Sequence, residues 1–195
     1  SIEMEQTDIV VNEEKSQMLK KQWDDISQGY HDMIESNTVQ ASTVLYSQTR
    51  AKHGKKIIEV AAGSGIGSRV FTLAFMQRGA VYYSCDISTE MIKLLEASFD
   101  ESEITKAGIV NVTHLEEADM HQVEEYSKDD LTKRVFATVA NNEKLPFPSG
   151  SFDRYISNLS LMIVDNHMNQ LKEAHRVIES GGIAGFSVWG RIENC

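Results

Sequence analysis

Residues 55–69 have the sequence K-K-I-I-E-V-A-A-G-S-G-I-G-S-R. The apolar run of Ile57, Ile58 and Val60 is followed by glycines, a pattern typical of a buried strand that ends in a tight turn. Apolar residues then recur at helical spacing as far as Gly79, where a helix C-terminal cap is expected. This order of strand, loop and helix predicts an open α/β sheet, in which ligands bind at the carboxyl ends of the strands.

The spacing of the loop glycines limits the class of ligand. Gly63, Gly65 and Gly67 form G-x-G-x-G, whereas a dinucleotide-binding loop has G-x-G-x-x-G and a P-loop continues into Gly-Lys-Ser/Thr. Glu59 precedes the loop, where its carboxylate would oppose a pyrophosphate and would suit a ligand that carries a cationic group. The loop alone is weak evidence, and an ordinary structural turn is the alternative.

The composition limits the class of protein. A chain of 195 residues is long enough for one domain with a substantial core. The formal net charge of −10 argues against a nucleic-acid partner, because phosphates would be repelled. Two cysteines do not indicate a disulfide framework, and no apolar run approaches the ~20 residues that span a bilayer. Because the acidic N-terminus also lacks the pattern of a targeting peptide, we expect a cytoplasmic protein with no membrane span. The oligomeric state is left open.

Residues 1–50 precede the predicted sheet. They are expected to form a mobile acidic arm to about residue 15, an amphipathic helix over 15–36 and a second helix over 40–49. These helices could simply pack against the sheet, or they could cap a ligand pocket with Trp23, Tyr30 and His31 facing the ligand. Residues 51–195 are expected to form the sheet domain, so that the chain is a single structural domain with an N-terminal helical cap.

A second strand is predicted at 80–86, where A-V-Y-Y-S-C-D ends in Asp86. An acid about 20 residues past the glycine loop, at the end of the next strand, is placed to accept hydrogen bonds from ribose hydroxyls. Ile87 and Met91 would then flank an adenine. The alternative is that Asp86 caps the helix expected over 89–99.

The middle of the chain offers two candidates for the third strand, 109–115 and 134–140. We favour the later one, because it leads directly into L-P-F-P-S-G-S-F-D at 145–153. The roughly 30 residues before it are too many for a simple loop and would form an insertion or an extra edge element.

The last third of the chain continues the alternation of strand and helix. A fourth strand is expected from Phe152, followed by a helix over 165–179 that Gly181 and Gly182 would terminate. A fifth strand is expected over 182–190.

The chain resembles the class I S-adenosylmethionine-dependent methyltransferases, and within them the small-molecule branch that includes the ubiquinone and menaquinone C-methyltransferases. Four motifs in the family's order carry this resemblance, which spans about residues 23–189. They are E-V-A-A-G-S-G-I-G at 59–67, C-D-I-S-T-E-M at 85–91, N-E-K-L-P-F-P-S-G-S-F-D at 142–153 and L-K-E-A-H-R-V-I-E-S-G-G at 171–182. The resemblance implies a Rossmann-like, doubly wound, mostly parallel sheet with helices on both faces. The family's sheet has seven strands, so we expect the last strands to be missing from the given chain.

The resemblance also implies S-adenosyl-L-methionine as cofactor, with S-adenosyl-L-homocysteine as its product, and a small-molecule methyl acceptor without a metal. The methionine part would lie against Glu59, Ala61 and Gly63, and Asp86 would take both ribose hydroxyls. Asn142 and Glu143 would contact the adenine amino group; the family has an acid after Gly there, which keeps Asp119 as a rival. The complete cofactor-binding set is Tyr30, Glu59, Ala61, Gly63, Ser64, Gly65, Asp86, Ile87, Met91, Asn141, Asn142, Glu143 and Asn158.

A methyl group on a sulfonium is already activated, so such a protein has mainly to align it with a nucleophile and to exclude water. A general base is needed only if the acceptor must lose a proton. Its weak candidates are His31, Tyr155 and His167. The sequence thus predicts methyl transfer to a small molecule by direct displacement. The alternatives are a catalytically idle methyltransferase-like binding or assembly domain, and an NAD(P)-dependent oxidoreductase, which the glycine spacing disfavours.

Overall fold

The computed structural model describes residues 9–100, 105 and 108–190, so most of the predicted N-terminal arm lies outside the described residues. Six strands form one sheet in the order β3-β4-β2-β1-β5-β6, and every neighbouring pair is parallel. The strands are β1 (Lys56–Val60), β2 (Val81–Asp86), β3 (Val110–His114), β4 (Lys133–Val139), β5 (Phe152–Asn158) and β6 (Ile178–Ser187). The predicted Rossmann-like, parallel α/β fold is confirmed.

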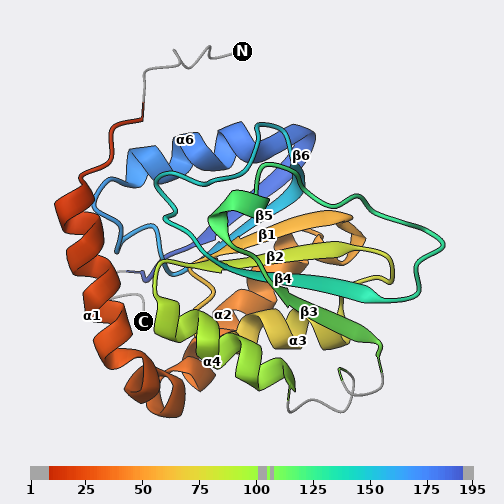
Figure 1. The fold of residues 1–195 in the computed structure, drawn as a ribbon, viewed down its shortest axis with the longest axis horizontal. Helices are drawn as coiled ribbons and strands as arrows, with labels where there is room; N and C mark the ends of the chain where they lie inside the picture. The colour runs from red at the N-terminus through yellow and green to blue at the C-terminus, as the bar shows by residue number, and fades with distance from the viewer. Residues whose placement is uncertain (1–8, 101–104, 106–107, 191–195) are drawn as a thin grey trace.

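Helices cover both faces of this sheet (Figure 1). Figure 1 shows α2, α3 and α4 on one side, α6 on the other, and α1 standing across one end of the strands. The helices are α1 (Glu13–Met33), α2 (Glu35–Gln48), α3 (Ile66–Ala74), α4 (Thr89–Asp100) and α6 (His167–Val177), with short 3-10 turns η1 (Ala51–His53) and η2 (Glu117–Asp119). No helix in the described ranges has both the length and the apolarity needed to cross a bilayer.

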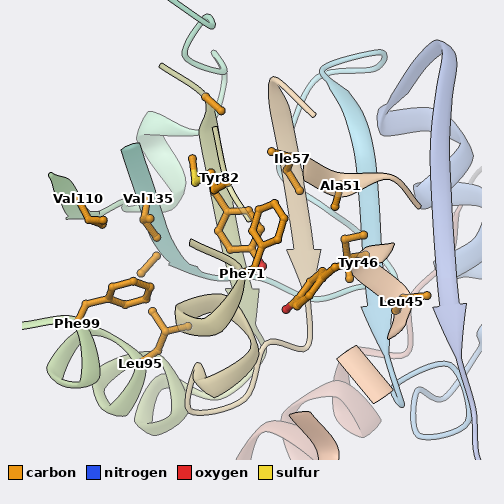
Figure 2. Packing of buried hydrophobic residues seen from close by; sticks show 14 of the residues in the cluster. Leu45, Tyr46, Ala51, Ile57, Phe71, Tyr82, Leu95, Phe99, Val110 and Val135 are labelled. Carbon is orange, nitrogen blue, oxygen red and sulfur yellow. The ribbon is translucent and has the colours of Figure 1, made fainter. Parts of the chain in front are cut away.

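The buried side chains form two clusters, one on each face of the sheet, because successive residues of a strand point to opposite faces. Ile57 and Tyr82 belong to the cluster under α2, α3 and α4, which Figure 2 shows from close by. Their neighbours Ile58 and Tyr83 belong to the cluster under α6. Nearly all residues of β1 and β2 are buried, as expected for central parallel strands that are covered on both faces.

Both candidates for the third strand are strands. The favoured segment is β4, which pairs with β2 from Val81↔Arg134 to Asp86↔Val139. The earlier segment is β3, which pairs with β4 and forms the edge of the sheet. The prediction of an extra edge element before β4 is therefore confirmed, and the strand expected as the fifth is the sixth, β6.

The end of α6 differs from the prediction. The helix begins at His167 because the Asn166 side chain accepts hydrogen bonds from the backbone N–H groups of Met168 and Asn169. It ends at Val177, before the glycines, because Ile178 already pairs with Phe152 of β5. Gly181 and Gly182 lie inside β6, at the register shift between Phe152 and Arg154, so the prediction that they end the helix is wrong.

The two leading helices are confirmed with shifted limits. Asn12 caps α1 by accepting a hydrogen bond from Lys15 N at 3.1 Å, so the helix starts within the arm that was expected to be aperiodic. α2 begins at Glu35, five residues earlier than expected. Parts of the apolar stripe of α1, such as Met18 and Met33, are exposed, so burial against the sheet does not account for the whole helix.

The turn before β2 generates a prediction about stability. Gly79 has a φ of +73°, and a Cβ there would lie 1.9 Å from the backbone oxygen of Ser127. Gly108 has a similar φ of +69°, but a Cβ there would meet nothing within 4 Å. We expect Gly79→Ala to lower the free energy of unfolding by about 2–5 kcal/mol, from left-handed strain plus the clash, and Gly108→Ala by only ~1 kcal/mol.

Urea unfolding followed by circular dichroism would measure both variants. If both variants lost the same free energy of unfolding, the backbone at Ser127 would be able to move away from the added methyl group without cost.

Candidate functional site

A cavity of about 400 Å³ lies at the carboxyl ends of the central strands, beneath α1 and α2. We call it the main cavity. Its lining combines the ends of β1, β2 and β5 with cap residues that lie more than 100 positions from the β5 end in the chain. The lining residues are Leu19, Trp23, Tyr30, Ile34, Thr38, Ala61, Gly63, Asp86, Ile87, Met91, Asn141, Asn142, Asn158, Leu159, Ser160, Met162, Ile163, Val164 and Trp189. A more open groove of about 590 Å³ adjoins it along α1 and shares Leu19, Ile87, Asn141 and Ile163.

The cap is held over this cavity by polar contacts to the loops at the strand ends. On α1, Asp24 accepts hydrogen bonds from Ser88 Oγ at 2.7 Å and from Glu90 N at 3.1 Å, so it caps the start of α4 across the interface. Lys15 forms an ion pair with Asp165 at 2.6 Å on the opposite wall. Of the two roles left open for α1, capping of the pocket is the one that the structure supports, since Trp23 and Tyr30 line the cavity.

The glycine loop bends the backbone sharply beside the cavity. Ala61 has a φ of +52°, a left-handed conformation that residues with a side chain rarely adopt, and Gly63 has a φ of +60°. Gly63 N donates a hydrogen bond of 2.9 Å to Asp86 Oδ2. Gly65 instead packs the start of α3 against α4, because a Cβ there would lie 2.6 Å from Leu95 Cγ. Ala61 and Gly63 line the main cavity, whereas Ser64 and Gly65 do not.

A second strained residue closes the opposite wall. Leu159 follows β5 with a φ of +57°, and its N–H donates to Ser187 Oγ at 3.0 Å. Ser187 Oγ in turn donates to Asn158 Oδ1 at 2.6 Å. Strained backbone of this kind persists where surrounding contacts fix it, and it concentrates at functional sites. Ala61 and Leu159 both line the main cavity, which supports a functional role for this cavity.

Asp86 lies at the centre of the strand ends. Its Oδ2 accepts from Gly63 N and its Oδ1 from Ser88 N, each at 2.9 Å. Burial raises the pKa of this carboxyl above its ordinary value. Two carboxylate oxygens offer about four acceptor positions, so two backbone bonds leave capacity for a ligand. The start of α4 is capped by Asp24 and Ser88, so the helix-cap alternative does not account for Asp86.

The predicted adenine contacts divide between two hollows. Asn141 and Asn142 line the main cavity, and the buried Asn142 Oδ1 has no hydrogen-bond partner. Glu143 borders the adjoining groove and accepts a hydrogen bond from Asn169 Nδ2 at 3.3 Å. The rival, Asp119, is exposed in η2 and lines neither hollow. The geometry thus favours Asn142 over Asp119.

Glu59 points away from the main cavity. Its Oε1 accepts a hydrogen bond from Tyr46 OH at 2.8 Å, and its Oε2 accepts from Ser68 Oγ at 2.5 Å and from Tyr82 OH. The carboxylate borders only a small space of about 30 Å³, which it shares with Gly63 and the cap residue Glu35. Its partners are therefore hydroxyl groups of α2, α3 and β2, and a cationic ligand group would reach it only through this small space.

Glu35 contacts the glycine loop and was not predicted from the sequence as a residue of the site. This buried carboxylate accepts hydrogen bonds from Ile66 N, at the start of α3, at 2.8 Å and from His31 Nδ1 at 3.0 Å. His31 Nδ1 also lies 3.0 Å from Ser64 Oγ. Glu35 thereby joins the cap to the glycine loop. Because 31 positions separate Glu35 from Ile66, no local sequence pattern could have indicated the contact.

None of the three candidate bases lines the main cavity. His31 contacts Glu35 and Ser64 outside it, and His167 is exposed at the start of α6. Tyr155 is fully buried in the cluster under α6, and burial raises the pKa of its hydroxyl far above the ordinary value. The geometry supports no general base among them.

The sequence analysis also missed most of the acceptor-side lining. These residues belong to the cap or follow β5 and β6, and most of them are apolar. They are Leu19, Ile34, Thr38, Leu159, Ser160, Met162, Ile163, Val164 and Trp189. The signal that could have found several of them is the apolar run at 161–164, which directly follows a strand end and precedes a helix.

Comparisons with known proteins find similarity to methyltransferases. A family model described as "Methyltransferase domain" matches residues 116–186. The chain is 38% identical over 74 residues to 2-methyl-6-phytyl-1,4-hydroquinone methyltransferase 2, chloroplastic, of Oryza sativa subsp. japonica, a match that covers 38% of this chain and 21% of that protein. It is 28% identical over 130 residues to demethylmenaquinone methyltransferase of Geobacillus stearothermophilus, a match that covers 67% of this chain and 43% of that protein. The chain thus matches less than half the length of these curated relatives.

Among solved structures, the fold is similar to that of a protein of Methanococcus maripaludis described as an inferred S-adenosyl-L-methionine-dependent methyltransferase. The TM-score is 0.54 at 13% identity, and the likeness covers 95% of this chain and 67% of that one. At this identity the likeness bears on the fold alone.

The buried Glu59 generates a prediction about pH. Burial, and then the nearby charge of Glu35, raise the pKa of Glu59 above its ordinary value of 4.5, against the opposing effect of the three hydroxyl donors. The folded state therefore holds this proton more tightly than the unfolded state. Its contribution to stability is fully present below about pH 4.5 and is lost as pH rises through the raised pKa.

We therefore expect the unfolding free energy of Glu59→Gln, minus that of the unaltered chain, to increase with pH from about 4.5 upward and then to level off. Denaturant titrations at a series of pH values would measure this difference. The exposed Glu117→Gln serves as control and is expected to show no such slope. A flat difference for Glu59→Gln would show that Glu59 ionises normally in the fold.

Three independent lines converge on one family. The four sequence motifs stand in its order, residues of the first three line one cavity at the strand ends, and the family model and the curated relatives are methyltransferases. S-adenosyl-L-methionine is the cofactor of that family. Over the matched residues the chain is similar to the class I S-adenosylmethionine-dependent methyltransferases.

Proposed function

We propose that this chain binds S-adenosyl-L-methionine in the main cavity and directs its methyl group to a small, quinone-type acceptor by direct displacement. One observation carries the proposal. Asp86, a buried carboxylate at the end of β2, and Asn142, whose buried Oδ1 has no hydrogen-bond partner, line one cavity beside the glycine loop. They match the hydroxyl and amino donors of an adenosine.

The size and chemistry of the cavity fit this cofactor. Its volume of about 400 Å³ lies within the range of roughly 300–1,000 Å³ that is usual for small-molecule sites. Asp86 would accept from the ribose hydroxyls, and Asn142 Oδ1 would accept from the adenine amino group. Ile87 and Met91 would flank the base. An amide oxygen accepts a hydrogen bond as a carboxylate does, so the asparagine at this place is compatible with the family's contact.

The methionine part would lie along Ala61 and Gly63, under Tyr30. Its ammonium group would then approach the small space that Glu35 and Glu59 border. Ser64 and Gly65 would act indirectly, by shaping the loop, because neither lines the main cavity.

The remaining lining suggests the acceptor. The wall formed by Leu159, Met162, Val164 and Trp189, with Ile34 of the cap, is apolar. Such a surface suits an aromatic or quinone ring better than a polar metabolite. The names of the rice and Geobacillus relatives specify a hydroquinone and demethylmenaquinone as what those proteins act on, which supports a quinone-type acceptor here.

When bound, the cofactor supplies an activated methyl group on a sulfonium. The chain then has to position the two reactants and keep water away. Trp23 and Tyr30 cover the cavity from the cap, and the contacts of Asp24 and Lys15 hold that cap in place. Burial chiefly raises the pKa of Tyr30, so this hydroxyl stays protonated and can donate a hydrogen bond near neutral pH.

Calorimetric titration tests the proposal. We expect S-adenosyl-L-methionine and S-adenosyl-L-homocysteine to bind the chain, and Asp86→Ala to weaken both about tenfold or more, ~1.4 kcal/mol for a lost ribose contact. NAD is expected not to bind. Asp129→Ala, the same substitution at an exposed position, controls for the loss of one negative charge.

Absence of binding by either sulfur compound would refute the proposal, and binding of NAD in their place would favour an oxidoreductase. Binding without methyl transfer to any quinol-type acceptor would favour the catalytically idle domain.

A further inference from the structure

The acceptor wall of the main cavity contains few polar side chains. Asn158 has both ends of its amide engaged, because its Nδ2 donates to Thr38 O at 3.2 Å and its Oδ1 accepts from Ser187 Oγ at 2.6 Å. Ser160 follows the strained Leu159 and is buried against the sheet with its hydroxyl in a polar network.

The network has four members, Gln170, Ser157, Ser160 and Tyr155. Gln170, which is fully buried on α6, donates from Nε2 to Ser157 Oγ at 2.9 Å and to Ser160 Oγ at 3.0 Å. The two serine oxygens lie 2.7 Å apart and share one hydrogen bond. Gln170 Nε2 also lies 3.5 Å from Tyr155 OH.

The two serines carry two hydroxyl hydrogens, and only one of them is used between the serines. The other cannot go to Gln170 Nε2, which is itself a donor. One hydroxyl hydrogen of the pair is therefore left without an acceptor. A buried donor left unsatisfied costs about 1–3 kcal/mol, so an acceptor group brought to it by a ligand would be favoured.

The count holds for the orientation of the Gln170 amide in the structure, in which Nε2 faces both serines and Oε1 is buried without a partner. A reversed amide would turn its oxygen toward the serines, where it would accept the surplus hydrogen. The Ser160 hydroxyl is therefore available to a ligand when Nε2 faces the serines.

Ser160 is the member of the pair that borders the main cavity. Ser157 is fully buried and does not line the main cavity, whereas Ser160 lines it. If Ser157 donates to Ser160, then Ser160 Oγ accepts two hydrogen bonds, and its own hydrogen points to the remaining direction. The bonds from Leu159 N to Ser187 fix the turn that presents it.

We propose that Ser160 is a specificity-determining residue, whose hydroxyl donates a hydrogen bond to an oxygen of the methyl acceptor. The acceptor would thus be an apolar ring that carries a phenolic or carbonyl oxygen, seated on the wall of Leu159, Met162 and Trp189. This inference rests on the proposed function in placing the acceptor there. It further identifies the Ser160 hydroxyl as the group that favours acceptors carrying an oxygen.

Matched probes test it by equilibrium dialysis. We expect the unaltered chain to bind 1-naphthol about threefold to tenfold more tightly than 1-methylnaphthalene, in which a methyl group replaces the hydroxyl; this is the effect of one hydrogen bond. Ser160→Ala should remove that preference by weakening 1-naphthol alone. Ser157→Ala, which removes a hydroxyl from the same network but leaves the Ser160 donor, should keep it.

Each measurement is made with and without S-adenosyl-L-homocysteine, so that failure of the cofactor to bind, which refutes the proposed function, is seen separately. Equal affinity of the unaltered chain for the two probes overturns the inference, and that result needs no variant. Equal weakening of both probes by Ser160→Ala also overturns it, because the hydroxyl would then act only on packing. Loss of the preference in Ser157→Ala as well would assign it to the network as a whole and not to Ser160.

Discussion

A buried carboxylate connects the elements around the first strand, and the position of the site depends on it. Glu59 of β1 receives hydrogen bonds from hydroxyls on α2, α3 and β2. A charge buried among apolar side chains is costly unless hydrogen bonds compensate it, and here the compensating groups come from three separate elements. The cap helix α2, the helix after the glycine loop and the neighbouring strand are thus fixed relative to one another, and the carboxyl ends of the strands open beneath the cap.

From this junction the site is built mainly by backbone. Gly63 N binds Asp86, so the glycine loop and the end of β2 form one unit. Ala61 and Leu159 hold left-handed conformations on opposite walls of the main cavity. The strain is retained because strand pairing and the bonds to Ser187 fix the adjacent backbone. Backbone strain and buried charge lower the stability of the fold, and both are common in preformed binding sites.

The sequence predicted the elements whose pattern is local and missed the contacts that are distant in the chain. The strands at 56–60 and 81–86 and the role of Asp86 as a cavity residue follow from apolar runs that end in Gly or Asp. The sequence reasoning chose one of two candidate segments for the third strand, but both are strands. Strand propensity does not determine how many strands a sheet contains. Gly181 and Gly182 were assigned to a helix end, although pairing of Ile178 with Phe152 ends the helix first.

The sequence by itself determined the alternation of strand and helix, the glycine loop and the family motifs, since each is encoded within a few neighbouring residues. Only the tertiary structure decided which side chains face the ligand. Glu59 has the position of a ligand-binding acid, yet it turns toward three hydroxyls, and Glu35 reaches the glycine loop from the cap. Ser160 borders the cavity because a turn after β5 is clamped to β6. Burial and hydrogen bonding between distant segments set these orientations, and a linear pattern contains no information about which segments meet.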